Sequence, residues 1–287
     1  MNAIFVFVHG ANSNSFHWSP MLREMTLLGH RALAVDLPGH GFGATFSASY
    51  QAPQDAAALA AAPAGIAGVP YTDNVAHVIE VVRRAGELGP VILVGHSRGG
   101  TTVTGVANAA PELLHRVVYM SGWCCVDLTL GGYMEEPEYA SSALNDLGAN
   151  LIAANPAELG ALRMNWRTAD PAVLATLKTA ILAEGTDAEF LAALNTLEPD
   201  DSLDAGDERV DAATWSRLPH TYVRLTADRS IPIELQDRFI READALTPDN
   251  PFDVRTLDTS HMGFLLHPEK AAALLAELAQ PVDGTPR

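Results

Sequence analysis

The sequence predicts an α/β protein in which a mostly parallel, doubly wound sheet carries an inserted helical cap. Up to residue 121, apolar runs of strand length alternate with helical segments, as in consecutive βαβ units. From residue 122 to 213 the segments are helical without convincing strands, and the alternation then resumes. We therefore expect residues 1–121 and 214–287 to form the core, and residues 122–213 to form a cap inserted after a strand that ends near Ser121.

The individual elements follow from apolar runs, helical periodicity and helix-stop residues. The expected strands are 3–8, 31–35, 91–94, 116–121, 220–226 and 252–257. The expected core helices are 16–28, 71–88, 101–110, 233–245 and 268–278. Within the cap, helices are expected over 137–154, 156–165, 171–183 and 187–194, several of them starting at Pro and Asp or Thr.

Local signals support the boundaries in the first half of the chain. Gly29 stops the first helix, and Gly89-Pro90 stops the amphipathic helix that carries Val78 and Val82 on its apolar stripe. Residues 44–70 break the alternation and contain an Ala-rich stretch. A short helix near 55–62 and a flap beside the functional site are the two interpretations of that stretch.

Composition excludes several classes of partner. The chain has 287 residues and a formal net charge of -17, with a pI near 4.8, so its field repels nucleic acids and anionic membranes. Its two cysteines, Cys124 and Cys125, are adjacent and cannot build a disulfide framework, so we expect free thiols. The N-terminus has no basic segment before its short apolar run. We expect a soluble, cytoplasmic protein, either monomer or homodimer.

The stretch Gly95-His96-Ser97-Arg98-Gly99 is the main functional signal. A Gly-x-Ser-x-Gly sequence between a strand and a helix is the pattern of a nucleophile elbow, in which the serine occupies a sharp turn. Glycine on either side gives the room that such a turn needs. The pentapeptide alone is a weak signal, but its position between an apolar run and a small-residue helix is the context that the motif requires.

A serine nucleophile needs a base, and that base needs an orienting acid. His261 follows the last expected strand, and Asp228 follows the strand after the cap, so the order is serine, acid, histidine. Asp127 is a weaker candidate for the acid, and Asp258 is expected to be a turn residue. The backbone N–H groups of Ala11 and Arg98 are the expected oxyanion donors.

The remaining histidines are expected to be structural. His9 and His96 flank the site and are interpreted as its neighbours. The others expected at the surface or in the cap are His17, His30, His77, His115, His220 and His267. Asp36 and His40 have side chains that can ligate metals, but their Pro/Gly-rich turn indicates a structural role. No metal or cofactor motif is present, so no cofactor is expected.

The chain resembles the α/β-hydrolase superfamily of serine hydrolases, through His9-Gly10, Asp36-Leu37-Pro38-Gly39-His40-Gly41, the elbow, Asp228 and His261. The resemblance covers nearly the whole chain and implies an α/β-hydrolase fold. Within the superfamily the sequence is most similar to small carboxylesterases related to plant methyl-ester esterases and hydroxynitrile lyases. Those lyases have a threonine after the loop histidine, where this chain has Gly10. The serine in the elbow is unlike the aspartate of dehalogenases and epoxide hydrolases.

The sequence therefore predicts a cofactor-independent hydrolase of a carboxylic ester, lactone or thioester that has an apolar part. The alternatives are C–C bond hydrolysis, or acyl transfer or cyclisation in a biosynthetic pathway, with the same triad, and a ligand-binding module without catalysis. Aromatic and sulfur side chains could line the pocket or simply fill the cap core. The candidates are Trp123, Tyr133, Met134, Trp166 and Met262.

Arg98 places a guanidinium beside the nucleophile, where relatives often have an uncharged residue. One interpretation is an ion pair with a carboxylate of the cap or a loop, for which Asp127, Glu135 and Glu136 are the candidates. The other is a bidentate contact with a carboxylate or polar carbonyl of the substrate.

Overall fold

A single parallel sheet organises the chain, and its strand order brings the elbow strand to the centre. The computed structural model describes residues 3–147 and 151–279. Six strands, all parallel, pair in the order β2-β1-β3-β4-β7-β8. Their bounds are β1 Ile4–Val8, β2 Arg31–Ala34, β3 Val91–Ser97, β4 Arg116–Gly122, β7 His220–Leu225 and β8 Asp253–Leu257. The predicted parallel sheet is confirmed, with boundaries shifted by a few residues at most.

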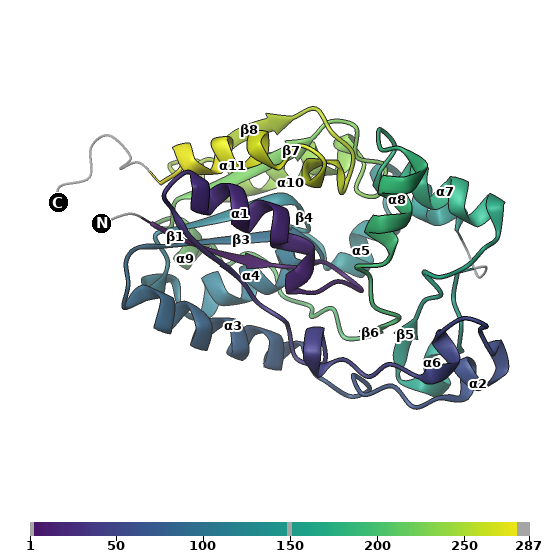
Figure 1. Cartoon of the computed structure of the whole chain (residues 1–287). Coiled ribbons are helices and arrows are strands. Elements are labelled where there is room, and N and C mark those ends of the chain that lie inside the picture. Colours follow the sequence, from purple (N-terminus) through teal and green to yellow (C-terminus); the bar gives the residue numbers. More distant parts are fainter. Residues whose placement is uncertain (1–2, 148–150, 280–287) are drawn as a thin grey trace.

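Helices cover both faces of the sheet because alternate strand residues point to opposite sides. Phe5 and Phe7 lie on the face that α1 and α11 cover, whereas Ile4, Val6 and Val8 lie on the face that α3, α4 and α10 cover (Figure 1). The core helices are α1 Ser19–Leu27, α3 Tyr71–Gly86, α4 Gly99–Ala109, α9 Ala212–Trp215, α10 Ile233–Leu246 and α11 Pro268–Glu277. The doubly wound arrangement expected from the sequence is therefore present.

Residues 122–147 and 151–213 lie beside the carboxyl ends of the strands, around a small apolar cluster that Met262 of the core also joins (Figure 1). Their elements are α5 Leu130–Met134, α6 Pro156–Leu159, β5 Ala161–Arg163, α7 Pro171–Ile181, α8 Asp187–Leu194 and β6 Asp200–Ser202, with single turns of 3-10 helix at Pro137–Tyr139 and Ala143–Asp146. In open α/β sheets, ligands bind at this end of the strands. Treating residues 122–213 as a separate cap domain stays a prediction.

Two expected helices in this region are wrong. The helix expected over 137–154 is replaced by two short 3-10 turns, and residues 148–150 of that range lie outside the described residues. The helix expected over 156–165 stops at Leu159, because Gly160 takes a left-handed conformation with φ +72 and the chain continues as a strand. That strand, β5, pairs antiparallel with β6. Such short strands lack the length for a periodic pattern.

A buried ion pair joins the β5–β6 hairpin to residues 44–70. Arg163 is 2% exposed and makes two 2.6 Å contacts with the Asp200 carboxylate. Its guanidinium also donates to the carbonyls of Leu59, Ala62 and Pro63. These residues end α2, Ala56–Ala61, the short helix that the Ala-rich stretch indicated.

In the described part of the chain, no helix is long and apolar enough to cross a membrane. Cytoplasmic location and the monomer or homodimer state stay predictions.

Arg163→Met should lower the free energy of unfolding by about 3–5 kcal/mol, because it leaves the Asp200 carboxylate buried without its partner. Urea denaturation measures this change. The double variant Arg163→Met/Asp200→Leu removes both charges and should recover much of the loss. A loss below about 1 kcal/mol in the single variant would show that the pair does not hold the hairpin.

Candidate active site

Ser97 sits at the tight junction between β3 and α4, with φ +54. A Cβ at Gly95 would lie 2.7 Å from the Gly99 carbonyl oxygen, and one at Gly99 would lie 2.6 Å from the His9 carbonyl oxygen. At Gly10, a Cβ would lie 2.7 Å from the Ser97 Cβ. The left-handed conformation of a serine is strained. Side chains at these glycines would prevent the approach of β1 and α4 that encloses it.

His261 and Asp228 meet after the strands that the sequence indicated. His261 Nδ1 lies 2.6 Å from Asp228 Oδ2, and the Asp228 side chain has no exposed surface. Asp228 Oδ1 accepts hydrogen bonds from the backbone N–H groups of Ser230 and Ile231. This carboxylate is therefore fixed in orientation, and it holds the imidazole from its Nδ1 side.

The alternative acids lie elsewhere. Asp127 is exposed in the loop after β4. Asp258 is also exposed, and it accepts a hydrogen bond from Thr226 at 2.8 Å. Of the three aspartates considered, Asp228 alone contacts the His261 ring in the described structure.

Ser97, His261 and the expected oxyanion donors line one cavity of about 600 Å³. Among the described residues, no turn, loop or side-chain hydrogen bond occupies the N–H of Ala11 or of Arg98. Nor does a hydrogen bond join Ser97 to His261 there. Catalytic contacts of this kind often tighten only when substrate binds.

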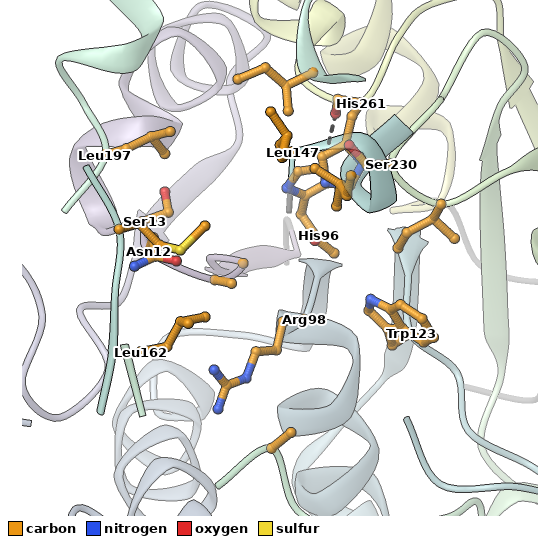
Figure 2. A pocket seen from close by; sticks show the side chains of 18 of the residues that line it. Asn12, Ser13, His96, Arg98, Trp123, Leu147, Leu162, Leu197, Ser230 and His261 are labelled. Atoms are coloured by element: carbon orange, nitrogen blue, oxygen red, sulfur yellow. Dashed lines mark hydrogen bonds between the residues drawn. The ribbon is translucent and has the colours of Figure 1, made fainter. Parts of the chain in front are cut away.

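The rest of the cavity wall is largely apolar. Figure 2 shows Trp123 and Asn12 on opposite sides of the cavity, with His96 and His261 between them. Of the five pocket candidates, four line the cavity: Trp123, Met134, Trp166 and Met262. Tyr133 does not belong to its lining. Instead it packs edge-to-face on Phe239, with ring centroids 4.9 Å apart, and its hydroxyl contacts Glu242.

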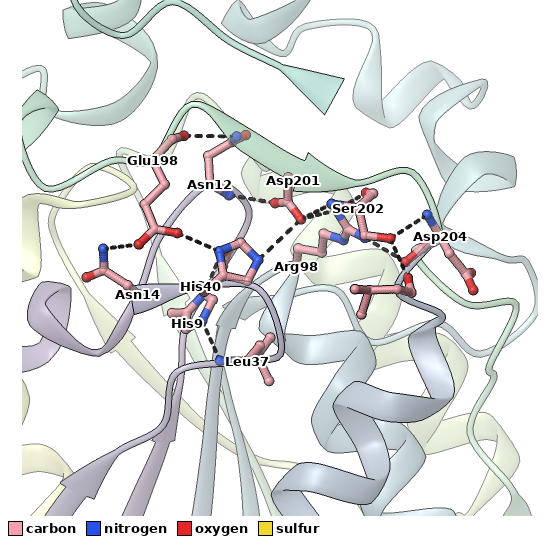
Figure 3. Close-up of polar contacts among 12 residues, drawn as sticks. His9, Asn12, Asn14, Leu37, His40, Arg98, Glu198, Asp201, Ser202 and Asp204 are labelled. Carbon is pink, nitrogen blue, oxygen red and sulfur yellow. Dashed lines mark hydrogen bonds and ion pairs between the residues drawn. The ribbon is translucent and has the colours of Figure 1, made fainter. Parts of the chain in front are cut away.

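The Arg98 side chain forms an ion pair, but with none of the three carboxylates proposed from the sequence. Its Nη1 lies 2.9 Å from Asp201 Oδ1, and its guanidinium also donates to the carbonyls of Ser202 and Asp204 (Figure 3). Asp127, Glu135 and Glu136 were therefore wrong as partners. Because these donors are already engaged within the protein, the arrangement favours a structural guanidinium over one that binds the substrate.

Asp201 belongs to a buried cluster of balanced charge that includes Arg98, His40 and Glu198 (Figure 3). His40 Nδ1 lies 2.8 Å from Glu198 Oε2, and His40 Nε2 lies 3.6 Å from Asp201 Oδ1. Glu198 is 2% exposed and Asp201 is 4% exposed. Charges at this depth are tolerated when they are paired and hydrogen-bonded.

Burial alone lowers the pKa of His40, but the contacts of its ring with Asp201 and Glu198 outweigh burial and raise that pKa to about 9. His40 is therefore an imidazolium at neutral pH. Burial also tends to raise the pKa of Asp201, yet Arg98 and His40 hold it well below its usual value. In contrast, burial and the charge of His40 lower the pKa of His9 to about 3. The neutral His9 ring accepts the Leu37 N–H and contacts the Gly10 carbonyl.

Two histidines expected at the surface or in the cap are buried instead, His17 beside the cavity and His220 in the core. His17 stacks on His96 with ring centroids 5.8 Å apart, and burial lowers the pKa of His17 to about 3. His220 packs on Trp215, with ring centroids 4.1 Å apart. His96 is a neighbour of the site as expected, since its Nε2 lies 3.0 Å from the carbonyl oxygen of His261.

Sequence reasoning missed several residues of the site. Ser121, with φ +39, donates to Asp228 Oδ2 at 2.6 Å. Glu198 and Asp201 lie more than 100 residues from the loops they contact, so local spacing could not reveal them. The one sequence feature that could have indicated these carboxylates was His40, because a titratable side chain in a turn that needs no charge suggests a buried partner. No group of residues suited to hold a metal ion occurs in the described ranges.

The model of the alpha/beta hydrolase family matches residues 5–274. The chain belongs to this family. Among solved structures, polyneuridine aldehyde esterase superposes with a TM-score of 0.71 at 20% identity, over 98% of this chain and all of that one. That likeness supports the fold and leaves the substrate open.

Two curated relatives match the chain with lower coverage. "Putative methylesterase 14, chloroplastic" of Arabidopsis thaliana is 22% identical over 284 residues, which are 96% of this chain and 72% of that protein. A (E)-2-((N-methylformamido)methylene)succinate hydrolase of Acinetobacter baylyi is 28% identical over 117 residues. That match spans 41% of this chain and 36% of the Acinetobacter protein.

The raised pKa of His40 makes the fold less stable in alkali. Its stabilising charge is fully present below the ordinary pKa of 6.5 and is lost as the pH rises through about 9. Between pH 6.5 and 9.5 the free energy of unfolding should therefore fall by about 3 kcal/mol through this group. Urea denaturation across that range measures the fall, which His40→Gln should reduce. His77→Gln, which removes an exposed imidazole, should retain the wild-type slope. Identical slopes for His40→Gln and wild type would refute the assignment.

Proposed function

We propose that this protein is a cofactor-independent serine hydrolase that cleaves a carboxylic ester, lactone or thioester through an acyl-enzyme. Ser97 is the nucleophile, His261 the general base and Asp228 the orienting acid. The backbone N–H groups of Ala11 and Arg98 form the oxyanion hole. The carrying observation is that His261, held by a buried 2.6 Å contact with Asp228, lines the same cavity as the elbow serine.

In the proposed reaction, the Ser97 Oγ attacks the substrate carbonyl carbon as its proton moves to His261 Nε2. Asp228 keeps the imidazole proton on Nδ1 and stabilises the imidazolium that forms. The carbonyl π bond opens to an oxyanion between the Ala11 and Arg98 N–H groups. Collapse expels the alcohol or thiol, which takes the proton from His261. A water then gives a proton to His261 as its oxygen attacks the acyl carbon; the bond from that carbon to Ser97 Oγ breaks, the acid leaves, and the proton passes from His261 to Ser97 Oγ.

The cavity favours a substrate with a substantial apolar part. Leucine, isoleucine, methionine and tryptophan side chains make up much of its lining, alongside the polar groups of Ser97 and of the loop after β1. A volume of about 600 Å³ suits a small molecule. The names of the Arabidopsis methylesterase and of polyneuridine aldehyde esterase make methyl esters of bulky apolar acids the first substrates to test.

The Gly10 position supports hydrolysis over hydroxynitrile lyase chemistry. In the lyases that the sequence resembles, a threonine occupies this position. Here a Cβ at Gly10 would lie 2.7 Å from Ser97 Cβ and 3.2 Å from Ser97 Oγ. A threonine would therefore displace the serine of this chain.

Replacing Ser97 with alanine should reduce kcat/KM for a p-nitrophenyl ester by at least about 10⁴-fold, because the nucleophile is lost while the oxyanion donors remain. Initial rates of p-nitrophenolate release measure the effect. The matched control is Ser216→Ala, at an exposed serine outside the cavity, which should keep the wild-type rate. Turnover by Ser97→Ala within tenfold of wild type would refute the proposed mechanism.

A further inference from the structure

One carboxylate of β6 contacts both segments that carry the expected oxyanion donors. Asp201 Oδ2 accepts the backbone N–H of Asn12, the residue after Ala11, at 2.6 Å. Asp201 Oδ1 lies 2.9 Å from Arg98 Nη1. Ala11 and Arg98 come from loops that follow different strands, β1 and β3. Figure 3 shows the Asp201 side chain between Asn12 and Arg98, so this carboxylate links the two segments that carry the expected donors.

The loop after β1 needs such an anchor because Asn12 has φ +51, in the left-handed region. Besides its N–H bond to Asp201, Asn12 donates from Nδ2 to the carbonyls of Glu198 and Pro199 at 3.1 Å each. The Glu198 N–H donates to the Asn12 carbonyl at 2.7 Å. Asn14 adds a 2.8 Å bond to the Glu198 carboxylate. The segment leading into β6 thus holds the backbone around Ala11 from one side.

The chemistry of the contact calls for a carboxylate. Among the described residues, the hydrogen-bond and ion-pair partners of Asp201 Oδ1 and Oδ2 are all donors: the N–H groups of Asn12 and Ser202, the Arg98 guanidinium, and the His40 ring at 3.6 Å. An asparagine would turn an NH₂ group toward one set of these donors. Asparagine therefore fits the volume of the site but breaks one half of the contact.

We propose that Asp201 is a positioning residue that sets the two oxyanion donors, Ala11 N–H and Arg98 N–H, at their working separation. The proposal rests on the serine hydrolase mechanism above. Asp201 belongs to the segment that covers the site. Because it touches neither Ser97 Oγ nor the substrate carbonyl carbon, it acts through Asn12 and Arg98. Misplaced donors weaken binding of the oxyanion more than binding of the neutral carbonyl, so the effect belongs to the transition state.

Asp201→Asn should lower kcat for a p-nitrophenyl ester by about 10²-fold while KM changes by less than about threefold. A trifluoromethyl ketone gives an independent measure, because Ser97 adds to its carbonyl, the oxygen becomes an oxyanion, and the proton passes to His261. Its inhibition constant should rise in step with the loss of kcat/KM across the variants. A merely structural defect would lower the fraction of active enzyme, but the inhibition constant of the remaining active enzyme would not rise with the loss of kcat/KM.

Asp200→Asn is the matched control, because Asp200 is the preceding buried carboxylate of β6 and pairs with Arg163 instead of the oxyanion segments. At a temperature where circular dichroism shows both variants folded, it should keep the wild-type kcat and inhibitor affinity. Equal kcat values for Asp201→Asn and wild type, or equal losses in the two variants, would overturn the proposal.

If Asp201→Asn does not fold, Arg98→Met tests the same link, since it removes the guanidinium and leaves the backbone N–H. A fall in kcat of at least tenfold with unchanged KM supports the proposal, and a wild-type kcat overturns it. Failure of the hydrolase mechanism itself would look different, because wild-type protein would then show no Ser97-dependent turnover at all.

Discussion

The close approach of three chain segments at Ser97 is the constraint on which the site depends. The loop after β1, the end of β3 and the start of α4 meet at distances that leave no room for a Cβ at Gly10, Gly95 or Gly99. This packing stabilises a serine in the left-handed region and directs its side chain toward the cavity. The core helices and the parallel sheet supply the rigid frame that offsets the strain at that one residue.

A second constraint crosses the boundary between the sheet and the segment that covers it. Two positive groups, Arg98 and protonated His40, lie among two buried carboxylates, Glu198 and Asp201. Apolar side chains alone could pack the covering segment against the sheet. The charged contacts do more, because they fix the positions of particular backbone atoms relative to one another. The atoms that they fix belong to the loop after β1 and to the residue after Ser97.

Much of the fold could be predicted from the sequence because it depends on local patterns. Apolar runs indicated all six strands of the parallel sheet. The elbow, the downstream acid and the histidine indicated Ser97, Asp228 and His261. In the structure, Ser97 and His261 line one cavity and Asp228 contacts His261. The β5–β6 hairpin was missed because each strand has only three residues. The partners of Arg98 were also missed, because Asp201 reaches it through tertiary packing across more than 100 residues of chain. Tyr133 was assigned to the pocket by residue type, whereas its side chain points into the core, where its hydroxyl contacts Glu242.

The central claim, that Ser97 is the nucleophile of an acyl-transfer reaction, is tested most directly by diethyl p-nitrophenyl phosphate followed by peptide mass mapping. The Ser97 oxygen should attack phosphorus and expel p-nitrophenolate, giving one diethylphosphoryl group per chain on the peptide that contains Ser97. Loss of esterase activity should parallel its formation. Full activity after complete modification of Ser97, or inactivation with the label on another residue, would contradict the account.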